Sequence, residues 1–250
     1  SFVWSGEDLD ITVLFWQPLF EEMSQKVSVG LCGQGADELH AGYPRFRNIS
    51  AHADLIQKRM DLGGQVSINA NSVGLAQPWV DGIVDPKKHL TDLTSTLQFE
   101  MDRGQLANFQ LRLGDRHSMA YGLELRVPFL GTAHRKASHH LPLNWRLSED
   151  NEKMALREAA KLTNLPNNII HRPKIPAGTA TAPSQISNLI NELKPRSLEW
   201  ASEYGNLAPM LRDQPDMAIG LRIFHAMHFT DSKNGMRSGS LLDVLDDVSN

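Results

Sequence analysis

The sequence predicts an α/β protein in which part of a parallel sheet near the start is followed by a predominantly helical half. The run Val27–Leu31 is apolar and rich in β-branched residues, which is typical of a buried strand. Ahead of it, one apolar helical face is formed by Leu14, Phe15, Leu19, Phe20 and Met23. A helix followed by such a strand is the order found in parallel α/β sheets.

Helical spacing dominates the remainder of the chain. Glycines and prolines between residues 45 and 86 indicate loops with one or two short helices. Apolar residues then recur at helical intervals over 93–113, 186–193 and 217–224, and 153–161 is a strong helix by propensity, ended by Pro166 and the two asparagines after it. The loop from Ile175 to Thr181 is a candidate lid, and the polar tail after Thr230 is expected to fray.

The strand at Val27–Leu31 leads into a turn containing Gly33 and Gly35, and the following helix carries Asp37 and Glu38 in its first turn. This geometry can present backbone N–H groups to an anion, and glycine allows a positive φ and a close approach to a ligand. The two acids would repel a bare phosphate unless one of them holds a metal ion. The turn therefore indicates a metal–phosphate or acyl-phosphate site, with a simple N-capped helix as the alternative.

Composition excludes several classes of function. The net charge of −4 without a basic run gives no electrostatic case for nucleic acid. No apolar run approaches the roughly 20 residues of a membrane helix, and the first ten residues do not form a signal peptide. The single Cys32 excludes an internal disulfide framework and is expected to be a small buried residue rather than a reactive thiol. We therefore expect a cytoplasmic protein without a membrane or nucleic-acid partner.

Three motifs, in order, resemble the synthetase domain of glutamine-dependent asparagine synthetases. The first is GQGADELHAGY, residues 33–43, and the second is the segment 115–130 containing L-E-L-R-V-P-F-L. The third is the K-x-x-L-R helix that starts at Lys153, followed by Arg172-Pro-Lys174. The resemblance covers roughly residues 12–175. It implies part of an adenine-nucleotide alpha hydrolase-like (ATP pyrophosphatase) fold.

The resemblance also implies a reaction and its residues. ATP activates a carboxylate such as aspartate as an acyl-adenylate and releases pyrophosphate, and ammonia from glutamine then gives an amide and AMP. Asp37 corresponds to the Mg²⁺-holding acid, Lys174 to the lysine that reaches the reacting phosphate, and Glu124 to an acid that faces the cleft in β-lactam synthetases. The nucleotide and substrate side is lined by Cys32, Gly33, Gln34 and Gly35.

Some positions depart from the family pattern. Gln34 stands where many members carry Asp or Glu, so it cannot act as a base. Gly131 and His117 also replace common residues, without removing an obvious chemical group. Asp115, Arg116, Glu124 and Arg126 are four charges amid apolar residues, and an ion-pair network is the simplest reading for the two arginines.

Ser5–Asp10 differs from an SGGxDS phosphate loop, because Glu7 replaces the second glycine and Asp10 the serine. We therefore expect the phosphate loop and any glutaminase domain to be missing from this chain and supplied by an upstream segment or another polypeptide. The chain then reads as a single domain fragment over 1–250, with the end of the nucleotide-binding sheet at 1–50, a mostly helical part at 51–232 and a polar tail at 233–250.

Three other functions stay open. A sibling ligase of the β-lactam synthetase or lasso-peptide cyclase type would use the same adenylation chemistry to close a ring. A non-catalytic scaffold or a nucleotide-binding regulatory module would fit the absence of an SGGxDS loop. The acceptor carboxylate, the amine donor and the assembly state, with a homodimer as one option, are not determined by the sequence.

Overall fold

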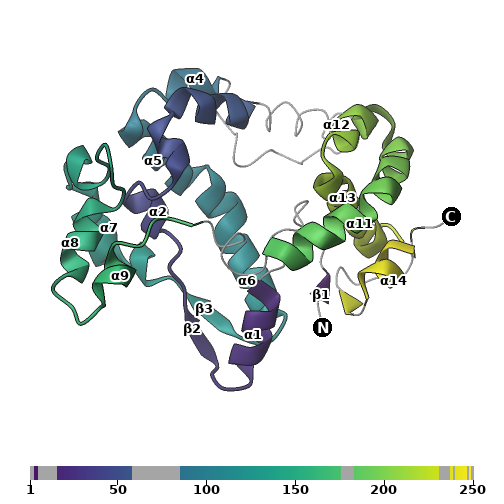
Figure 1. The fold of residues 1–250 in the computed structure, drawn as a ribbon, viewed down its shortest axis with the longest axis horizontal. Helices are drawn as coiled ribbons and strands as arrows, with labels where there is room; N and C mark the ends of the chain where they lie inside the picture. Colours follow the sequence, from purple (N-terminus) through teal and green to yellow (C-terminus); the bar gives the residue numbers. More distant parts are fainter. Residues whose placement is uncertain are drawn as a thin grey trace. The chain divides into compact units, whose positions relative to one another are not determined.

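The computed structural model describes residues 3–4, 16–57, 85–175, 183–230, 237–238, 240–246 and 248 (Figure 1). Several predicted features lie outside these residues. They are the Ser5–Asp10 segment, Leu14 and Phe15 of the first helix, most of the loops expected between residues 45 and 86, and residues 176–181 of the candidate lid. The internal contacts of the chain divide it into two compact units.

One unit comprises Leu31–Arg112 and Arg126–Lys174 and is called the turn unit, because it contains the glycine turn. Its helices are α2 (Ala36–Leu39), α4 (Pro86–His89), α5 (Leu93–Asp102), α7 (Thr132–His139), α8 (Met154–Ala160), α9 (Asn167–Ile170) and a stretch at residues 49–57. It also contains the 3-10 helices η2 (Pro44–Arg47), η4 (Pro128–Leu130) and η5 (Leu143–Trp145) and the π-helix η3 (Leu106–Gln110). The short helix α2 packs against α5 and α7, so the residues that follow the turn lie at the centre of this unit.

The other unit comprises Ser1–Gly30, Leu113–Leu125 and Ile175–Asn250 and is called the helical unit. It contains α1 (Gln17–Ser24), most of α6 (Leu111–Met119), α11 (Pro183–Ala201), η6 (Ser202–Leu207), α12 (Ala208–Arg212), α13 (Pro215–His228) and α14 (Leu241–Asp246). A short antiparallel pair joins β1 (Val3–Trp4) to β4 (Arg237–Ser238).

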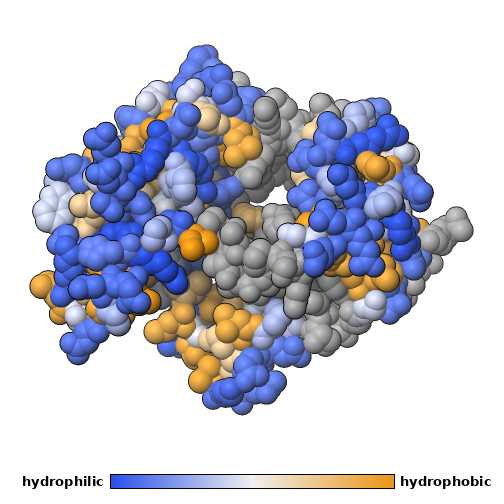
Figure 2. Space-filling model, in the orientation of Figure 1, coloured by the Kyte–Doolittle hydropathy of each residue, from blue (hydrophilic) through white to orange (hydrophobic). Residues whose placement is uncertain are grey.

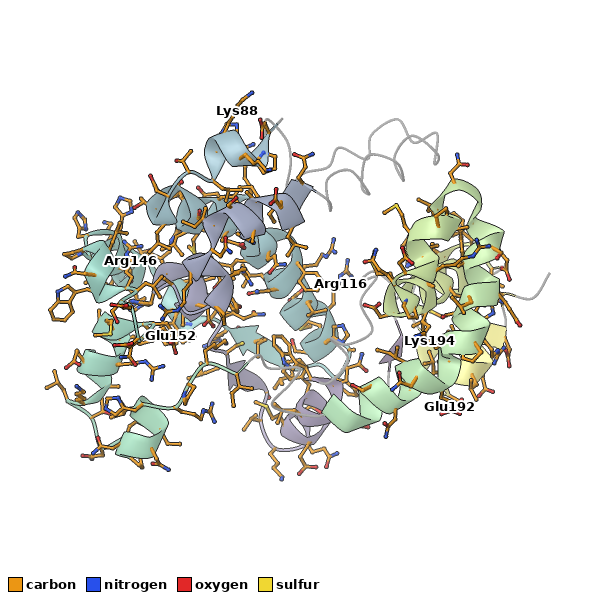
Figure 3. All side chains as sticks on the ribbon, turned by 45° about the horizontal axis from the view of Figure 1, so that its top comes forward. Lys88, Arg116, Arg146, Glu152, Glu192 and Lys194 are labelled. Atoms are coloured by element: carbon orange, nitrogen blue, oxygen red, sulfur yellow. The ribbon has the colours of Figure 1, made fainter. Side chains whose placement is uncertain are left out.

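The core of the helical unit lies between α11, α13 and α14. Leu193 of α11 is buried, whereas its neighbours Glu192 and Lys194 are exposed and extend from the helix (Figure 3). On the face drawn in Figure 2, these helices show mainly hydrophilic side chains. This is the amphipathic pattern predicted over 186–193, and the helix indicated by the spacing over 217–224 is α13.

The predicted strand is β2 (Val29–Leu31), and it pairs with β3 (Glu124–Arg126). The Glu124 N–H donates to the Ser28 carbonyl at 3.0 Å, and the Cys32 N–H donates to the Arg126 carbonyl at 2.8 Å. Residue numbers rise together on the two strands from the first bond to the second, so the strands point in the same direction and the pair is parallel. The protein is thus α/β and mostly helical, with a small parallel sheet.

Three local expectations are corrected by the structure. The strand was predicted to be buried, but Gly30 alone is buried in β2, whereas Val29 is partly exposed and Leu31 is 75% exposed. The helix α8 ends at Ala160, before Pro166, and Pro166 instead caps the short helix α9. The tail expected to fray contains α14, because its apolar residues Leu241, Val244 and Leu245 pack into the core.

Helix α14 gives a test of this packing. Leu245 is 0% exposed, so Leu245→Ala should lower the free energy of unfolding by about 2–5 kcal/mol, through lost burial and the cavity left behind. Leu242 lies on the same helix but is 41% exposed, so Leu242→Ala should cost less than about 0.5 kcal/mol. Urea denaturation of both variants measures the difference. Equal effects would show that α14 does not dock as described.

Candidate functional site

The glycine turn places α2 through a backbone conformation that favours glycine. Gly35 caps α2 with φ 89°, and a Cβ built on it would overlap Cδ2 of Leu130. A positive φ and this close approach both require a residue without a side chain. The same contact joins the first sequence motif to the Pro-Phe-Leu end of the second. A Cβ on Gly33 would meet nothing within 4 Å.

Asp37 lies at the centre of an ion cluster, which we call the Asp37 cluster, with Lys153 and Lys174. Its side-chain oxygens face one lysine each. Lys153 Nζ lies 2.8 Å from Oδ1, and Lys174 Nζ donates a hydrogen bond to Oδ2 at 3.1 Å. Asp37 is only 8% exposed, and the two lysine side chains are about one-fifth exposed. The cluster therefore carries one more positive than negative charge in a partly desolvated place.

Lys153 reaches Asp37 from an uncommon backbone conformation. It caps α8 with φ 56° and ψ 37°, a left-handed conformation that few residues other than glycine adopt. Its N–H donates to the His40 carbonyl at 3.2 Å. Such a conformation costs about 1–3 kcal/mol and persists only where the surroundings hold it in place. The strained backbone at Lys153 thus helps to place its ammonium group beside Asp37.

Gly42 brings the backbone directly against this cluster. Its N–H donates to the Asp37 carbonyl at 2.8 Å, and a Cβ built on it would overlap both Asp37 Oδ1 and Lys153 Cε. The Lys153 side chain therefore occupies the space that a side chain at position 42 would need, so only glycine fits there.

A buried polar layer lies next to the Asp37 cluster. Glu100 is fully buried and lies 2.6 Å from Nε2 of His52 and 3.4 Å from Nε of Arg45. The guanidinium carbon of Arg45 stands 3.9 Å from the centre of the Tyr43 ring, in a cation–π contact. Burial raises the pKa of the Tyr43 hydroxyl, so it stays protonated and can act as a hydrogen-bond donor or acceptor.

Glu38 is the unusual acid of this layer. It is 1% exposed, and neither carboxylate oxygen has a hydrogen-bond partner among the described residues. Burial is the main cause that raises its pKa to about 7; the nearby charges of Asp37 and Glu100 act in the same direction, whereas its own backbone N–H and the attraction of Arg45 act against it. Glu38 is therefore close to half-protonated at neutral pH.

Gln34 is held by a residue that the sequence did not indicate. Its Nε2 donates to the Gln110 carbonyl at 2.6 Å, and Nε2 of Gln110 donates to the Tyr43 hydroxyl at 2.9 Å. Gln110 ends the π-helix η3, and π-turns often occur at functional sites. The π-turn thus ties the glycine turn to Tyr43.

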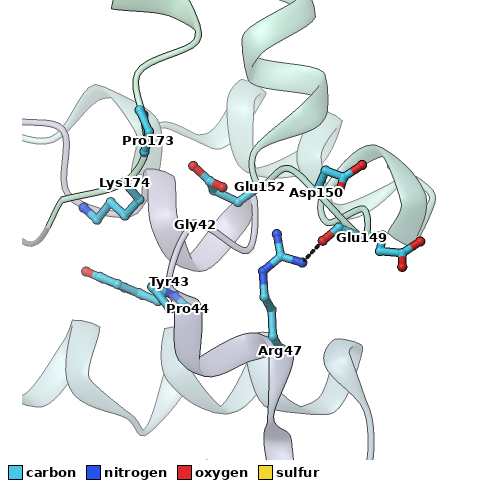
Figure 4. A pocket seen from close by; sticks show the side chains of 9 residues that line it. All are labelled: Gly42, Tyr43, Pro44, Arg47, Glu149, Asp150, Glu152, Pro173 and Lys174. Atoms are coloured by element: carbon cyan, nitrogen blue, oxygen red, sulfur yellow. Dashed lines mark hydrogen bonds between the residues drawn. The ribbon is translucent and has the colours of Figure 1, made fainter.

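A pocket of about 370 Å³ opens beside Lys174 (Figure 4). It is lined by Gly42, Tyr43, Pro44, Arg47, Glu149, Asp150, Glu152, Pro173 and Lys174. Arg47 NH1 donates to the carbonyls of Ser148 at 2.8 Å and Glu149 at 2.7 Å, which fixes the guanidinium at the rim. The lining offers both cationic and anionic groups within one small space.

The structure brings some predicted site residues together and leaves others apart. Asp37 and Lys174 meet although they are 137 positions apart in the sequence. Cys32 is half-buried, and burial raises the pKa of its thiol, which agrees with an unreactive cysteine. Glu124 lies exposed on β3 and belongs to the helical unit, so its role stays a prediction.

Lys153 and Gln110 were missed as site residues. Lys153 was visible as the first residue of the K-x-x-L-R helix, which was the available signal, whereas nothing local in the sequence marks Gln110.

The charged residues Asp115, Arg116, Glu124 and Arg126 are all exposed rather than buried, so burial does not require them to be paired. In Figure 3, Arg116 extends from α6.

The donor atoms around Asp37 limit how a metal ion could be held there. Among the described residues, no group of three or more histidine, cysteine, aspartate or glutamate side chains is placed to hold a metal ion. Asp37 offers a single carboxylate with a lysine on each oxygen. Mg²⁺ is commonly bound by one or two carboxylates together with substrate phosphates and water. The site therefore fits a metal ion that arrives with phosphate groups, and does not fit one that must be held by protein ligands alone.

The close approach at Gly42 predicts a strong effect of a single methyl group. Gly42→Ala should push Asp37 and Lys153 apart and lower the free energy of unfolding by about 1–3 kcal/mol. Gly33→Ala, where the added methyl meets nothing, should change it by less than about 0.5 kcal/mol. Denaturant titration compares the two variants. An unaffected Gly42→Ala would contradict the described contact.

Glu38 predicts a pH dependence of stability. Its folded-state pKa of about 7 lies above the unfolded value of 4.5, so the folded protein keeps a proton that the unfolded chain releases. Stability from this group is therefore full below pH 4.5 and is lost as pH rises towards 7. At pH 8 the free energy of unfolding of Glu38→Gln should exceed that of the wild type by up to about 3 kcal/mol, whereas at pH 4 the two should differ little.

Denaturant titrations at the two pH values measure this effect. Glu158→Gln is the control, because Glu158 is exposed in a surface pair with Lys161 and should change stability little at either pH. A constant difference between Glu38→Gln and wild type across pH would show that Glu38 titrates normally.

Comparisons with known proteins agree with the motifs. A sequence profile of the family described as asparagine synthase matches residues 14–203. Asparagine synthetase (glutamine-hydrolyzing) 3 of Bacillus subtilis (strain 168) is 26% identical over 205 residues, covering 75% of this chain and 32% of that protein. Asparagine synthetase (glutamine-hydrolyzing) of Rattus norvegicus is 45% identical over 74 residues, covering 28% of this chain and 13% of that protein.

The chain thus spans about a third or less of the length of these relatives. The profile match, in contrast, covers more than half of this chain and includes the glycine turn, the Pro-Phe-Leu segment, Lys153 and Lys174. On this ground the protein belongs to the asparagine synthase family, as a synthetase domain.

Proposed function

We propose that this chain supplies the synthetase part of an ATP-dependent amide-forming ligase of the asparagine synthetase type. A carboxylate oxygen of an aspartate-like substrate attacks the α-phosphorus of ATP, the bond to the β-phosphate breaks, and pyrophosphate leaves. Ammonia from glutamine then attacks the acyl carbon, the acyl–oxygen bond breaks, and AMP leaves with loss of a proton from nitrogen. The observation that carries the proposal is the Asp37 cluster behind the glycine turn.

The lysines suit the first step. Pyrophosphate departure builds negative charge on phosphate oxygens, and two ammonium groups held in a partly desolvated place stabilise that charge more than they would in water. Lys174 is the group that we expect to follow the reacting phosphate, and Lys153 stands on the other side of the carboxylate. Asp37 would hold Mg²⁺, which would supply positive charge to the phosphate groups. Cys32, Gly33, Gln34 and Gly35 would line the nucleotide.

Gln34 is proposed to orient the substrate rather than to remove a proton. Its Nε2 is committed to the Gln110 carbonyl, which leaves the amide oxygen as an acceptor. Loss of the proton from the attacking amine must then depend on another group, and Glu124 is our candidate. An unchanged amide-forming rate in Glu124→Gln would rule out that role.

The pocket beside Lys174 is the proposed place of the carboxylate substrate. Lys174 belongs to both the pocket and the Asp37 cluster, so a carboxylate bound there would stand next to the lysine that reaches the phosphate. The nearby Arg47 supplies a second cation at the rim.

The wider setting is proposed from the family. The parallel pair β2–β3 supports part of an ATP pyrophosphatase fold. Such a ligase would need a phosphate loop and a glutaminase domain from an upstream segment or another polypeptide, and we propose that it acts in the cytoplasm. In the part of the chain that is described, no helix has both the length and the apolar character needed to cross a bilayer.

Pyrophosphate release tests the proposal. With ATP, Mg²⁺, aspartate and ammonia, the longest native form should release pyrophosphate, and Lys174→Ala should lower the rate at least about 100-fold, since it removes a charge that acts on the leaving group. Lys161→Ala is the control, because Lys161 is an exposed lysine paired with Glu158 at the end of α8, and it should retain the full rate.

The substrate dependence separates the alternatives. Release with another carboxylate but not with aspartate would indicate a sibling ligase of the β-lactam synthetase or lasso-peptide cyclase type. Nucleotide binding without release from any carboxylate would indicate a regulatory module. Neither binding nor release would indicate a scaffold and would overturn the proposal.

A further inference from the structure

The Asp37 cluster has a charge arrangement that bears on how a metal ion reaches it. Both carboxylate oxygens face an ammonium group, at 2.8 Å and 3.1 Å. Two positive charges against one negative charge leave an excess of one, and the burial of Asp37 weakens screening by water. A divalent cation approaching Asp37 alone would meet two like charges at close range.

The two lysines differ in how firmly they are held. The Lys153 backbone begins α8, donates to the His40 carbonyl, and is fixed in a left-handed conformation, while its side chain passes over Gly42. Lys174 follows α9 and lies 5.1 Å from the centre of the Tyr43 ring, beside the pocket. Lys153 is thus a built-in part of the cluster, whereas Lys174 borders the open space.

We propose that Lys153 is a positioning residue that makes metal binding at Asp37 depend on the nucleotide. A free divalent cation is excluded by the ammonium of Lys153, whereas a phosphate-bound one is accepted, because phosphate oxygens supply negative charge to both the metal and the lysines. This inference rests on the proposed function and deepens it. It gives the site an order of binding, in which metal enters together with ATP.

The arrangement has a chemical consequence for this family of reactions. Exclusion of the free ion keeps Asp37 available until a phosphate chain is present. Lys153 then performs two roles in sequence, first neutralising Asp37 and then sharing the charge of the phosphates.

The test uses Mn²⁺ as a paramagnetic substitute for Mg²⁺ and measures its binding to the longest native form by electron paramagnetic resonance. Each protein is titrated without nucleotide and with α,β-methylene-ATP, which cannot release pyrophosphate. Lys153→Met removes the charge and keeps the length, Lys153→Gln is a second neutral variant, and Lys153→Arg keeps the charge. Lys161→Met is the control on the same helix, because its ammonium pairs with the exposed Glu158.

We expect wild type to bind Mn²⁺ weakly alone and much more tightly with the analogue. Removal of a cation this close to a carboxylate should raise the affinity for Mn²⁺ alone by about tenfold or more in Lys153→Met and Lys153→Gln. Lys153→Arg and Lys161→Met should remain like wild type. Thermal unfolding without metal identifies any variant that does not fold. If either Lys153→Met or Lys153→Gln fails to fold, the Mn²⁺ affinity of the other one tests the inference.

An unchanged or lower affinity for Mn²⁺ alone in a folded neutral variant would overturn the inference. The proposed function is tested separately by Asp37→Asn, which should abolish the tight binding seen with the analogue. If that binding survives in Asp37→Asn, the assignment of Asp37 as the metal-holding acid fails, whatever the result for Lys153.

Discussion

The contact between Asp37 and its two lysines is the interaction on which the rest of the turn unit depends. It joins a residue of the glycine turn to the start of α8 and to the segment after α9, and it does so in a place with little water. A buried carboxylate without such partners would be costly. The left-handed backbone at Lys153 and the bare backbone at Gly42 can both be understood as conditions for this contact.

The three sequence motifs are distant in the chain but adjacent in the fold. Leu130 closes against Gly35, so the second motif supports the turn of the first, while Lys153 and Lys174 bring the third to Asp37. The order of the motifs is therefore less informative than their contacts. Leu130, Lys153 and Lys174 thus meet around Gly35 and Asp37 within the turn unit.

The sequence was sufficient for features that depend on local patterns. The strand after Val27, the glycine with positive φ and the helix after Lys153 were all predicted. The family resemblance assigned both Asp37 and Lys174 to the phosphates, and the structure brings these two residues into contact. Features that depend on long-range packing were not predicted. The raised pKa of Glu38 arises from burial beside other acids. Helix α14 forms because its apolar side chains pack against residues of α11 and α13, which lie earlier in the chain. The register of a short helix or a π-turn is likewise set by partners far along the chain.

The π-turn at η3 makes the site sensitive to the length of the chain as well as to its composition. A π-turn contains one residue more than an α-turn. Deletion of a single residue within Leu106–Gln110 would therefore let this segment form a regular α-helix. The residues before the deletion would then be rotated by about 100° relative to α6. Gln110 could then no longer face both Gln34 and Tyr43. Substitutions in this segment would be tolerated wherever packing allows, whereas a one-residue deletion would detach the glycine turn from its support.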